Sequence, residues 1–165
     1  FKSTDLTNWS LVQDVITAKN NIEDVDIMYL NHKFYITFEK EIVDKGDSSL
    51  NVATIDTTQA NKTTITQLLP ADCDHEPASV KATKNGFRIY YSCDKNYPGE
   101  SYSGSQIFYS DYDLNWNPIS IDCPVESETQ NGILLYEVKD GDHRKQYFLY
   151  SQDYLNEDNM IIEEQ

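Results

Sequence analysis

The amino-acid sequence predicts an all-β protein made of β-propeller blades, each a unit of four antiparallel strands. Two observations lead to this prediction. Twelve Tyr, six Phe and two Trp, together with many Thr, Ile and Val, give a composition that favours strands over helices. Two kinds of short sequence motif that favour turns, called turn words below, also recur in a fixed order along the chain. A repeat of about 50 residues is typical of propeller blades.

The first turn word places Asn between two strand-like runs. It occurs at Asn31, Asn85 and Asn131, within the runs "MYLNHKFYITFE", "VKATKNGFRIYYS" and "ETQNGILLYEV". Asn-Gly between alternating apolar runs is a strong hairpin signal, because both central residues of a two-residue turn adopt positive φ. We therefore expect a tight hairpin at each word, joining the first two strands of a blade.

The second turn word ends the third strand of each unit. The expected third strands read "SLNVATID", "SQIFYSDYD" and "KQYFLYSQD". Related words begin at Ser3 ("STDLTNW"), Ser110 ("SDYDLNW") and Ser151 ("SQDYLNE"), and their Asp and Asn side chains favour turns. Fourth strands follow as "WSLVQDVI", "NKTTITQLL", "WNPISIDC" and "MIIEEQ". We expect Trp9 and Trp116 to pack against neighbouring blades.

By this count, residues 1–165 form one propeller-like segment with blades that begin near residues 21, 74 and 124, preceded by the end of another blade. Known propellers close with about four to eight blades. Three and a part indicate a piece of a longer chain, several copies that complete a ring, or an open array. The alternative fold is an antiparallel β-sandwich, whose strands also recur every ~8–12 residues.

Charge and cysteine content limit the possible partners and compartments. The formal net charge of −15 and pI of about 4.3 disfavour binding to nucleic acid. No apolar run approaches the ~20 residues of a membrane span. Cys73, Cys93 and Cys123 allow either a disulfide plus a free thiol or three thiols. The sequons at Asn8 and Asn61 favour a secreted, extracellular glycoprotein.

Three stretches resemble the five-bladed propeller glycoside hydrolases, namely the arabinanase, xylosidase and fructosidase clans and their relatives. These stretches are "EDVDIMYLNHKFYITFE", "HEPASVKATKNGFRIYYS" and "FKSTDLTNW". In those families a blade opens with an acidic residue, runs through an aliphatic strand and an Asn-Gly hairpin, and ends with a turn like "YSxDLxNW". The third blade, "PVESETQNGILLYEV", departs from the pattern. The resemblance implies a carbohydrate-active propeller that hydrolyses or binds a glycan.

Glycoside hydrolysis usually needs two carboxyl groups across the scissile bond. The innermost strands of a propeller begin near its axis, so acidic residues at these positions can face one another. The candidates are Asp24 or Asp26, Glu76, and Glu126 or Glu128. From the resemblance, Glu76 is the expected general acid, and Asp24 is the carboxylate that contacts sugar hydroxyls or tunes the pKa of the acid.

Other residues are candidates for binding the substrate. His75 adjoins Glu76, and Tyr97 and Tyr102 lie in the loop "DKNYPGESYSGS", where Tyr rings could stack on sugars. Glu126 is a further candidate at the start of the third blade. The alternative function is a non-catalytic propeller segment of a secreted or surface assembly, which binds glycan or other protein subunits through its loops.

We expect no cofactor and no metal. No two His residues have the spacing of a zinc site. Asp111, Asp113 and Asn115 alternate like the first half of a calcium loop, but Trp116 occupies the position of the turn Gly. We therefore interpret Trp116 as a side chain packed between blades.

Overall fold

The computed structural model describes seven parts of the chain: residues 1–41, 46–59, 62–94, 106–125, 133–140, 143–151 and 160–164. These parts contain strands, turns and extended segments but no helix, so the all-β prediction is confirmed for them. The described residues therefore contain no helix that could cross a membrane. The strands are β1 (Ile22–Leu30), β2 (Lys33–Glu41), β3 (Ser48–Asp56), β4 (Lys62–Ala82), β5 (Gly86–Asp94), β6 (Gln106–Asp113), β7 (Pro118–Pro124), β8 (Ile133–Asp140), β9 (His143–Ser151) and β10 (Met160–Glu164).

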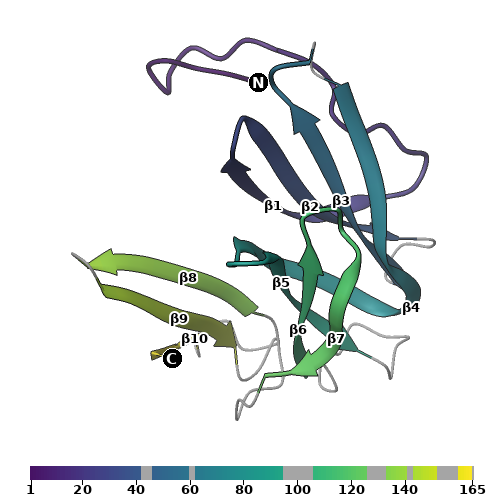
Figure 1. Cartoon of the computed structure of the whole chain (residues 1–165), viewed down its shortest axis with the longest axis vertical. Helices are drawn as coiled ribbons and strands as arrows, with labels where there is room; N and C mark the ends of the chain where they lie inside the picture. The colour runs from purple at the N-terminus through teal and green to yellow at the C-terminus, as the bar shows by residue number, and fades with distance from the viewer. Residues whose placement is uncertain are drawn as a thin grey trace.

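Strands β1 to β7 form one antiparallel sheet in chain order (Figure 1). Strand β4 has 21 residues and belongs to two ladders. Its residues 62–73 pair with β3, and its residues 74–82 pair with β5. We therefore distinguish a first sheet, formed by β1 to β3 and the start of β4, from a second sheet, formed by the end of β4 and β5 to β7.

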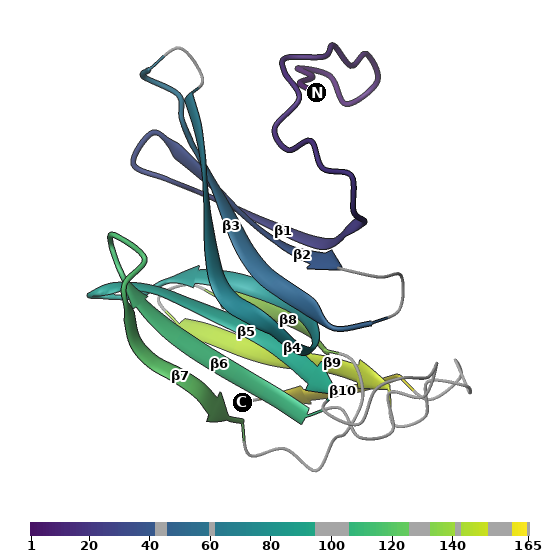
Figure 2. The same cartoon turned by 90° about the vertical axis from the view of Figure 1, so that its right-hand side faces the viewer.

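Strands β8 to β10 form a separate antiparallel sheet, the third sheet, in the order β10–β9–β8. Strand β8 lies close to β4 and β5, so the third sheet stands beside the second. In Figure 1 the first sheet lies above the second, and the third sheet lies to the left of the second. Figure 2 shows the first sheet above the second as well. The described strands thus form a stack of three antiparallel sheets, in which the second contacts the other two.

The main core lies between the first and second sheets. Leu50 and Leu69 of the first sheet pack in one cluster with Val80, Ile89 and Tyr91 of the second. All five side chains are less than 5% exposed. Removing these apolar faces from water is the main favourable contribution to joining the two sheets.

Trp116 extends this core beyond the strands. Its ring stacks on Phe87 with centroids 4.4 Å apart and lies 5.8 Å from the ring of Tyr35. Phe87 belongs to the second sheet and Tyr35 to the first. Trp116 thus contacts both sheets, and the prediction that it packs between four-stranded units is confirmed. Aromatic rings at these separations attract one another beyond their shared burial.

The Asn hairpins differ from one another. Asn31 and His32 have φ of 50° and 62°, and Leu30 pairs directly with Lys33, so the predicted two-residue turn is confirmed there. The second word also forms a two-residue hairpin, but its turn residues are Lys84 and Asn85, one residue earlier than the predicted Asn85 and Gly86. Asn131 lies outside the described residues.

At the second hairpin, β4 ends at Ala82 and β5 already begins at Gly86. The Thr83 amide donates to the Gly86 carbonyl at 2.9 Å, and this bond closes the turn over Lys84 and Asn85. Gly86 is required for a different reason from the expected one: a Cβ at this position would overlap the carbonyl oxygen of Tyr112 on β6. A tertiary contact therefore fixes this glycine.

The Asp turns are confirmed at three positions. The Asp5 carboxylate accepts the Thr7 and Asn8 amides at 3.0 and 2.8 Å. Asp56 accepts the Thr58 amide at 2.9 Å between β3 and β4. Between β6 and β7, the Asp113 carboxylate accepts the Asn115 and Asn117 amides, both at 2.8 Å. The "SQDYLNE" word lies almost entirely outside the described residues.

The expected fourth strand "WSLVQDVI" is wrong. Within the described residues 1–21, the only strand pairing is the single bridge between Lys2 and Ser10. Trp9 is 57% exposed, so the expectation that it packs against a neighbour is also wrong. The Asp5 turn forms from local hydrogen bonds alone, whereas a strand needs a partner along its length.

The structure distinguishes between the two cysteine arrangements that the sequence allows. Cys73 and Cys93 form a disulfide with Cα atoms 5.9 Å apart, and Cys123 is a free thiol. Cys73 is the residue at which β4 passes from the first sheet to the second. The disulfide therefore ties this bend to the end of β5.

Candidate functional site

Four carboxyl groups gather where the first and second sheets meet, and we call them the acidic cluster. They come from the start of β1 (Asp24), the end of β2 (Glu39) and the middle of β4 (Asp74 and Glu76). Glu39 interacts electrostatically with the other three. Two of these residues, Asp24 and Glu76, are the carboxylates that the sequence predicts as a catalytic pair.

Glu39 lies at the centre of the acidic cluster, and the sequence analysis missed it. Its side chain is only 3% exposed and hydrogen-bonds to Ser48 on β3. On β2 it lies on the same face as Tyr35 and Thr37, the face turned toward the second sheet. Its burial therefore depends on the packing of the second sheet against the first.

Asp24 reaches Glu39 because β1 is irregular. The register shifts between Glu23 and Asp26, and Asp24 has φ of 47°. This left-handed conformation is costly for a residue with a Cβ, and Asp is among the few residue types that tolerate it. The bulge turns the Asp24 side chain to hydrogen-bond with Glu39, while part of Asp24 remains exposed to solvent.

Burial and neighbouring charges raise the pKa values of two members of the acidic cluster, Glu39 and Asp24. Burial, followed by the negative charges of Asp74, Asp24 and Glu76, raises the pKa of Glu39 to about 9. Glu39 is then neutral at pH 7 and can donate a hydrogen bond. The pKa of Asp24 is raised by burial, and its hydrogen bond with Glu39 opposes this rise.

Glu76 occupies an intermediate position between solvent and core. It pairs with Ser92 on β5, and the Ser92 hydroxyl donates to its Oε2 at 3.2 Å. This contact holds one carboxylate oxygen and leaves Glu76 partly exposed. Asp26, the alternative to Asp24, has another role: its Oδ2 accepts the Val80 amide at 2.7 Å and so links β1 to β4.

His75 is buried between β3 and β5 and is 3% exposed. Its ring Nδ1 lies 2.6 Å from the Ser48 carbonyl oxygen, and its backbone amide donates to Ser48 Oγ at 2.7 Å. Nε2 lies 3.7 Å from Asp72. In this position His75 joins strands of the two sheets, and contact with a sugar would require an opening beside it.

The remaining predicted positions fall into two groups. Asn8 is exposed, and its Nδ2 donates to Asp5 at 2.8 Å, so its glycosylation stays a prediction. The others lie outside the described residues: Tyr97, Tyr102, Glu126, Glu128 and Asn61.

Among the described residues, one group of side chains has ligand atoms close enough to hold a metal ion, and the sequence analysis considered a calcium loop as a second site. Cys73, His75 and Cys93 have ligand atoms within 4.8 Å of one another, but the two sulfur atoms are bonded together. In the loop considered for calcium, Arg88 donates to Asp111 at 2.7 and 2.9 Å, and Asp113 accepts the amides described above. These atoms already have protein partners.

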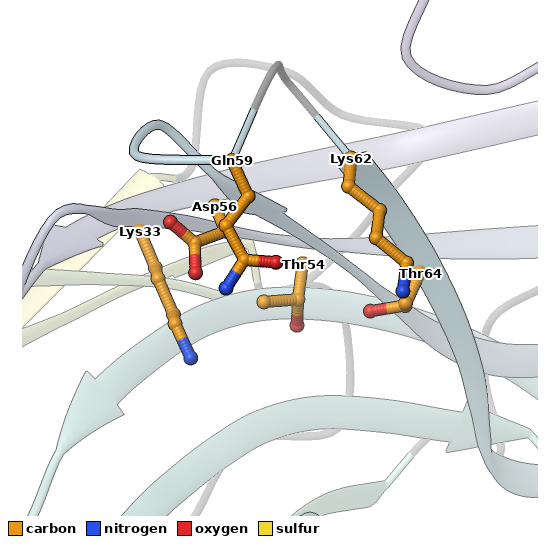
Figure 3. A pocket seen from close by; sticks show the side chains of 6 residues that line it. All are labelled: Lys33, Thr54, Asp56, Gln59, Lys62 and Thr64. Carbon is orange, nitrogen blue, oxygen red and sulfur yellow. The ribbon is translucent and has the colours of Figure 1, made fainter.

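A separate hollow of about 200 Å³ lies at the opposite end of β2 from the acidic cluster (Figure 3). Lys33, Asp56 and Lys62 are successive cross-strand partners in it, so their charges alternate in sign across three strands. Its lining contains no aromatic ring on which a sugar could stack. The lining residues are Lys33, Thr54, Asp56, Gln59, Lys62 and Thr64.

Comparison of the chain with known protein families, with curated proteins and with solved structures finds no match.

Proposed function

We propose that this chain is a carbohydrate-active β-propeller segment related to glycoside hydrolases, which hydrolyses a glycan at the acidic cluster. The supporting observation is the buried carboxyl group of Glu39 beside the more accessible Asp24 and Glu76. Carboxyl groups whose surroundings drive their pKa values apart are typical of acid–base catalysis.

The propeller arrangement is part of this proposal. The first and second sheets are successive four-stranded antiparallel units, they share β4, and they pack face to face. Successive units of this kind are what a propeller requires. The start of β1 and the middle of β4 bring their carboxyl groups together, as neighbouring innermost strands would.

The residues take different roles in the proposed reaction. Glu76 is partly exposed and donates a proton to the leaving-group oxygen as the glycosidic bond breaks. Asp24 contacts the sugar and supports the developing positive charge, and a water molecule then bonds to the anomeric carbon and returns a proton to Glu76. Glu39 is too buried to touch a substrate. It acts as a positioning residue that donates a hydrogen bond to the Asp24 carboxylate.

Secretion is also proposed. The Cys73–Cys93 disulfide supports it, because structural disulfides persist in oxidising compartments.

Activity on aryl glycosides tests the proposed function. We expect the parent chain to hydrolyse at least one such substrate and Glu76→Gln to lose about 100-fold or more in kcat/KM, since an amide cannot donate the catalytic proton. Asp14→Asn changes an exposed carboxylate away from the acidic cluster and should keep full activity. Absence of hydrolysis by the parent, or an unchanged rate in Glu76→Gln, would rule out the proposed reaction.

A non-catalytic role is the second candidate, in which the segment binds glycan or protein in a secreted or surface assembly. The observation that favours it is the exposed apolar side chains Ile27, Tyr29 and Ile65 on the first sheet. Retained glycan binding in a parent chain without hydrolytic activity would support this candidate.

A further inference from the structure

The outer face of the first sheet, turned away from the second sheet, carries a row of aliphatic side chains across four strands. Ile27, Ile36, Ala53 and Ile65 are successive cross-strand partners from β1 to β4. The two inner members are buried at 8% and 0% exposure, but Ile27 and Ile65 are 58% and 54% exposed. We call this row and the adjacent Tyr29 the outer apolar face.

The second sheet carries an equivalent row of aliphatic side chains, and the first sheet covers it. The sequence words "NHKFYITF" and "KNGFRIYY" place Ile36 and Ile89 at equivalent positions, and Ile89 pairs with Val80 as Ile36 pairs with Ile27. Val80 and Ile89 are 3% and 0% exposed, because the first sheet packs over them. The outer apolar face is therefore equivalent to a face that another sheet of this chain already covers.

Residues 1–21 cover the outer apolar face only in part. Val15 and Ile16 pack against Ile36 and its neighbours, and Gln13 Nε2 donates to Thr63 at 3.3 Å. Leu11 and Val12, just before them, remain 59% and 49% exposed. The segment thus covers the middle of the row and adds further apolar surface at its edge.

We propose that the outer apolar face docks a second copy of this chain, through the third sheet at the opposite end of the copy's stack. The packing of the first sheet on the second supplies the template: a face of this kind is covered by the opposite face of a neighbouring sheet, not by its own kind. In Figure 1, no other described strand lies beyond the third sheet on the side away from the second sheet. Such a head-to-tail contact is heterologous and builds rings or longer arrays.

Net charge sets the conditions under which the contact forms. Each copy carries a formal charge of −15, so two copies repel each other at low ionic strength. At about 1 M NaCl the screening length falls to ~3 Å and the apolar contact is also strengthened. Association should therefore tighten as salt is added, the reverse of an interface held by opposite charges.

Sedimentation velocity of the full chain over a range of concentrations tests the proposal. We expect reversible association that strengthens with NaCl and that Ile27→Asp weakens by about tenfold or more. Ile119→Asp is the matched control, because Ile119 is also an exposed isoleucine, at 59%, but lies on β7 of the second sheet. Circular dichroism and thermal melting verify that both variants remain folded.

Three results would overturn the proposal. The first is a parent chain that stays monomeric at every concentration and salt level. The second is equal weakening by Ile27→Asp and Ile119→Asp. The third comes from hydrogen–deuterium exchange: association should protect both β1 and the third sheet, and protection of β1 without the third sheet contradicts the head-to-tail contact.

Discussion

Glu39 occupies a strand position that alternation assigns to the interior, and its surroundings are themselves acidic. A buried carboxylate without a cation nearby is strongly disfavoured, so the group keeps its proton. The neutral acid can then donate a hydrogen bond to Asp24, which the bulge in β1 presents to it. The protonated Glu39 side chain thereby positions Asp24, which remains accessible to solvent.

This protonation makes stability depend on pH. The pKa of Glu39 is about 9 in the folded chain and near 4.5 when unfolded. Between these values the unfolded chain binds fewer protons, so the free energy of unfolding falls as pH rises, by up to about 1.4 kcal/mol per pH unit. We expect Glu39→Gln to remove this slope, because the amide keeps the donor but does not titrate.

Urea unfolding between about pH 5 and about pH 8 measures the effect. Glu39→Gln should be more stable than the parent chain at the upper end of this range. Glu23→Gln changes an exposed carboxylate directly opposite on β1 and should keep the slope of the parent. Parallel slopes in parent and Glu39→Gln would contradict a protonated Glu39.

At the scale of elements, the repeated turn words contributed unequally to the structure. The Asp turns at Asp56 and Asp113 join strands as predicted, because each is made from hydrogen bonds within a few residues. The Asp5 word forms the same local turn but no extended strand pair, since strand pairing needs more distant residues. Turns held by hydrogen bonds within a few residues could be predicted from the sequence, whereas the partner of each strand could not.

The same distinction explains what could be predicted of the acidic cluster. Asp24 lies near the start of β1, and Glu76 lies near the start of the part of β4 that pairs with β5, both within recognisable words, so the sequence located them. Glu39 lies near the end of β2, where a charge is usually solvated, and the packing of the second sheet buries it. Gly86 was noticed for its turn, but its real constraint is the carbonyl of Tyr112 on another strand.

Equivalent tryptophans of the repeat should therefore differ in their contribution to stability. Trp116 is partly buried, stacks on Phe87 and contacts Tyr35, so Trp116→Ala should lower the free energy of unfolding by about 1–3 kcal/mol. Trp9 is 57% exposed, and Trp9→Ala should change it by less than about 0.5 kcal/mol. Denaturant unfolding of the two variants measures the difference, and similar losses would show that Trp116 does not join the sheets.

At the scale of the whole molecule, one strand and one disulfide make the covalent connections between the first two sheets among the described residues. Strand β4 runs through both ladders, and the Cys73–Cys93 disulfide holds its bend against the end of β5. The acidic cluster lies at this same junction, with Asp74 directly after the bridged Cys73. Stability of the junction and protonation of the cluster should therefore change together.

Reduction of the disulfide tests this coupling. The bridge closes a loop with a sequence separation of 20 residues, and its loss should reduce the free energy of unfolding by about 3 kcal/mol, because the unfolded chain gains conformational freedom. Urea unfolding of a Cys123→Ser background, with and without a thiol reductant, isolates this bridge from exchange with the free thiol. If reduction also loosens the junction, water reaches Glu39, its pKa falls toward its ordinary value, and the pH slope of stability becomes shallower. An unchanged slope together with the full loss of stability would mean that the disulfide acts on the unfolded chain alone.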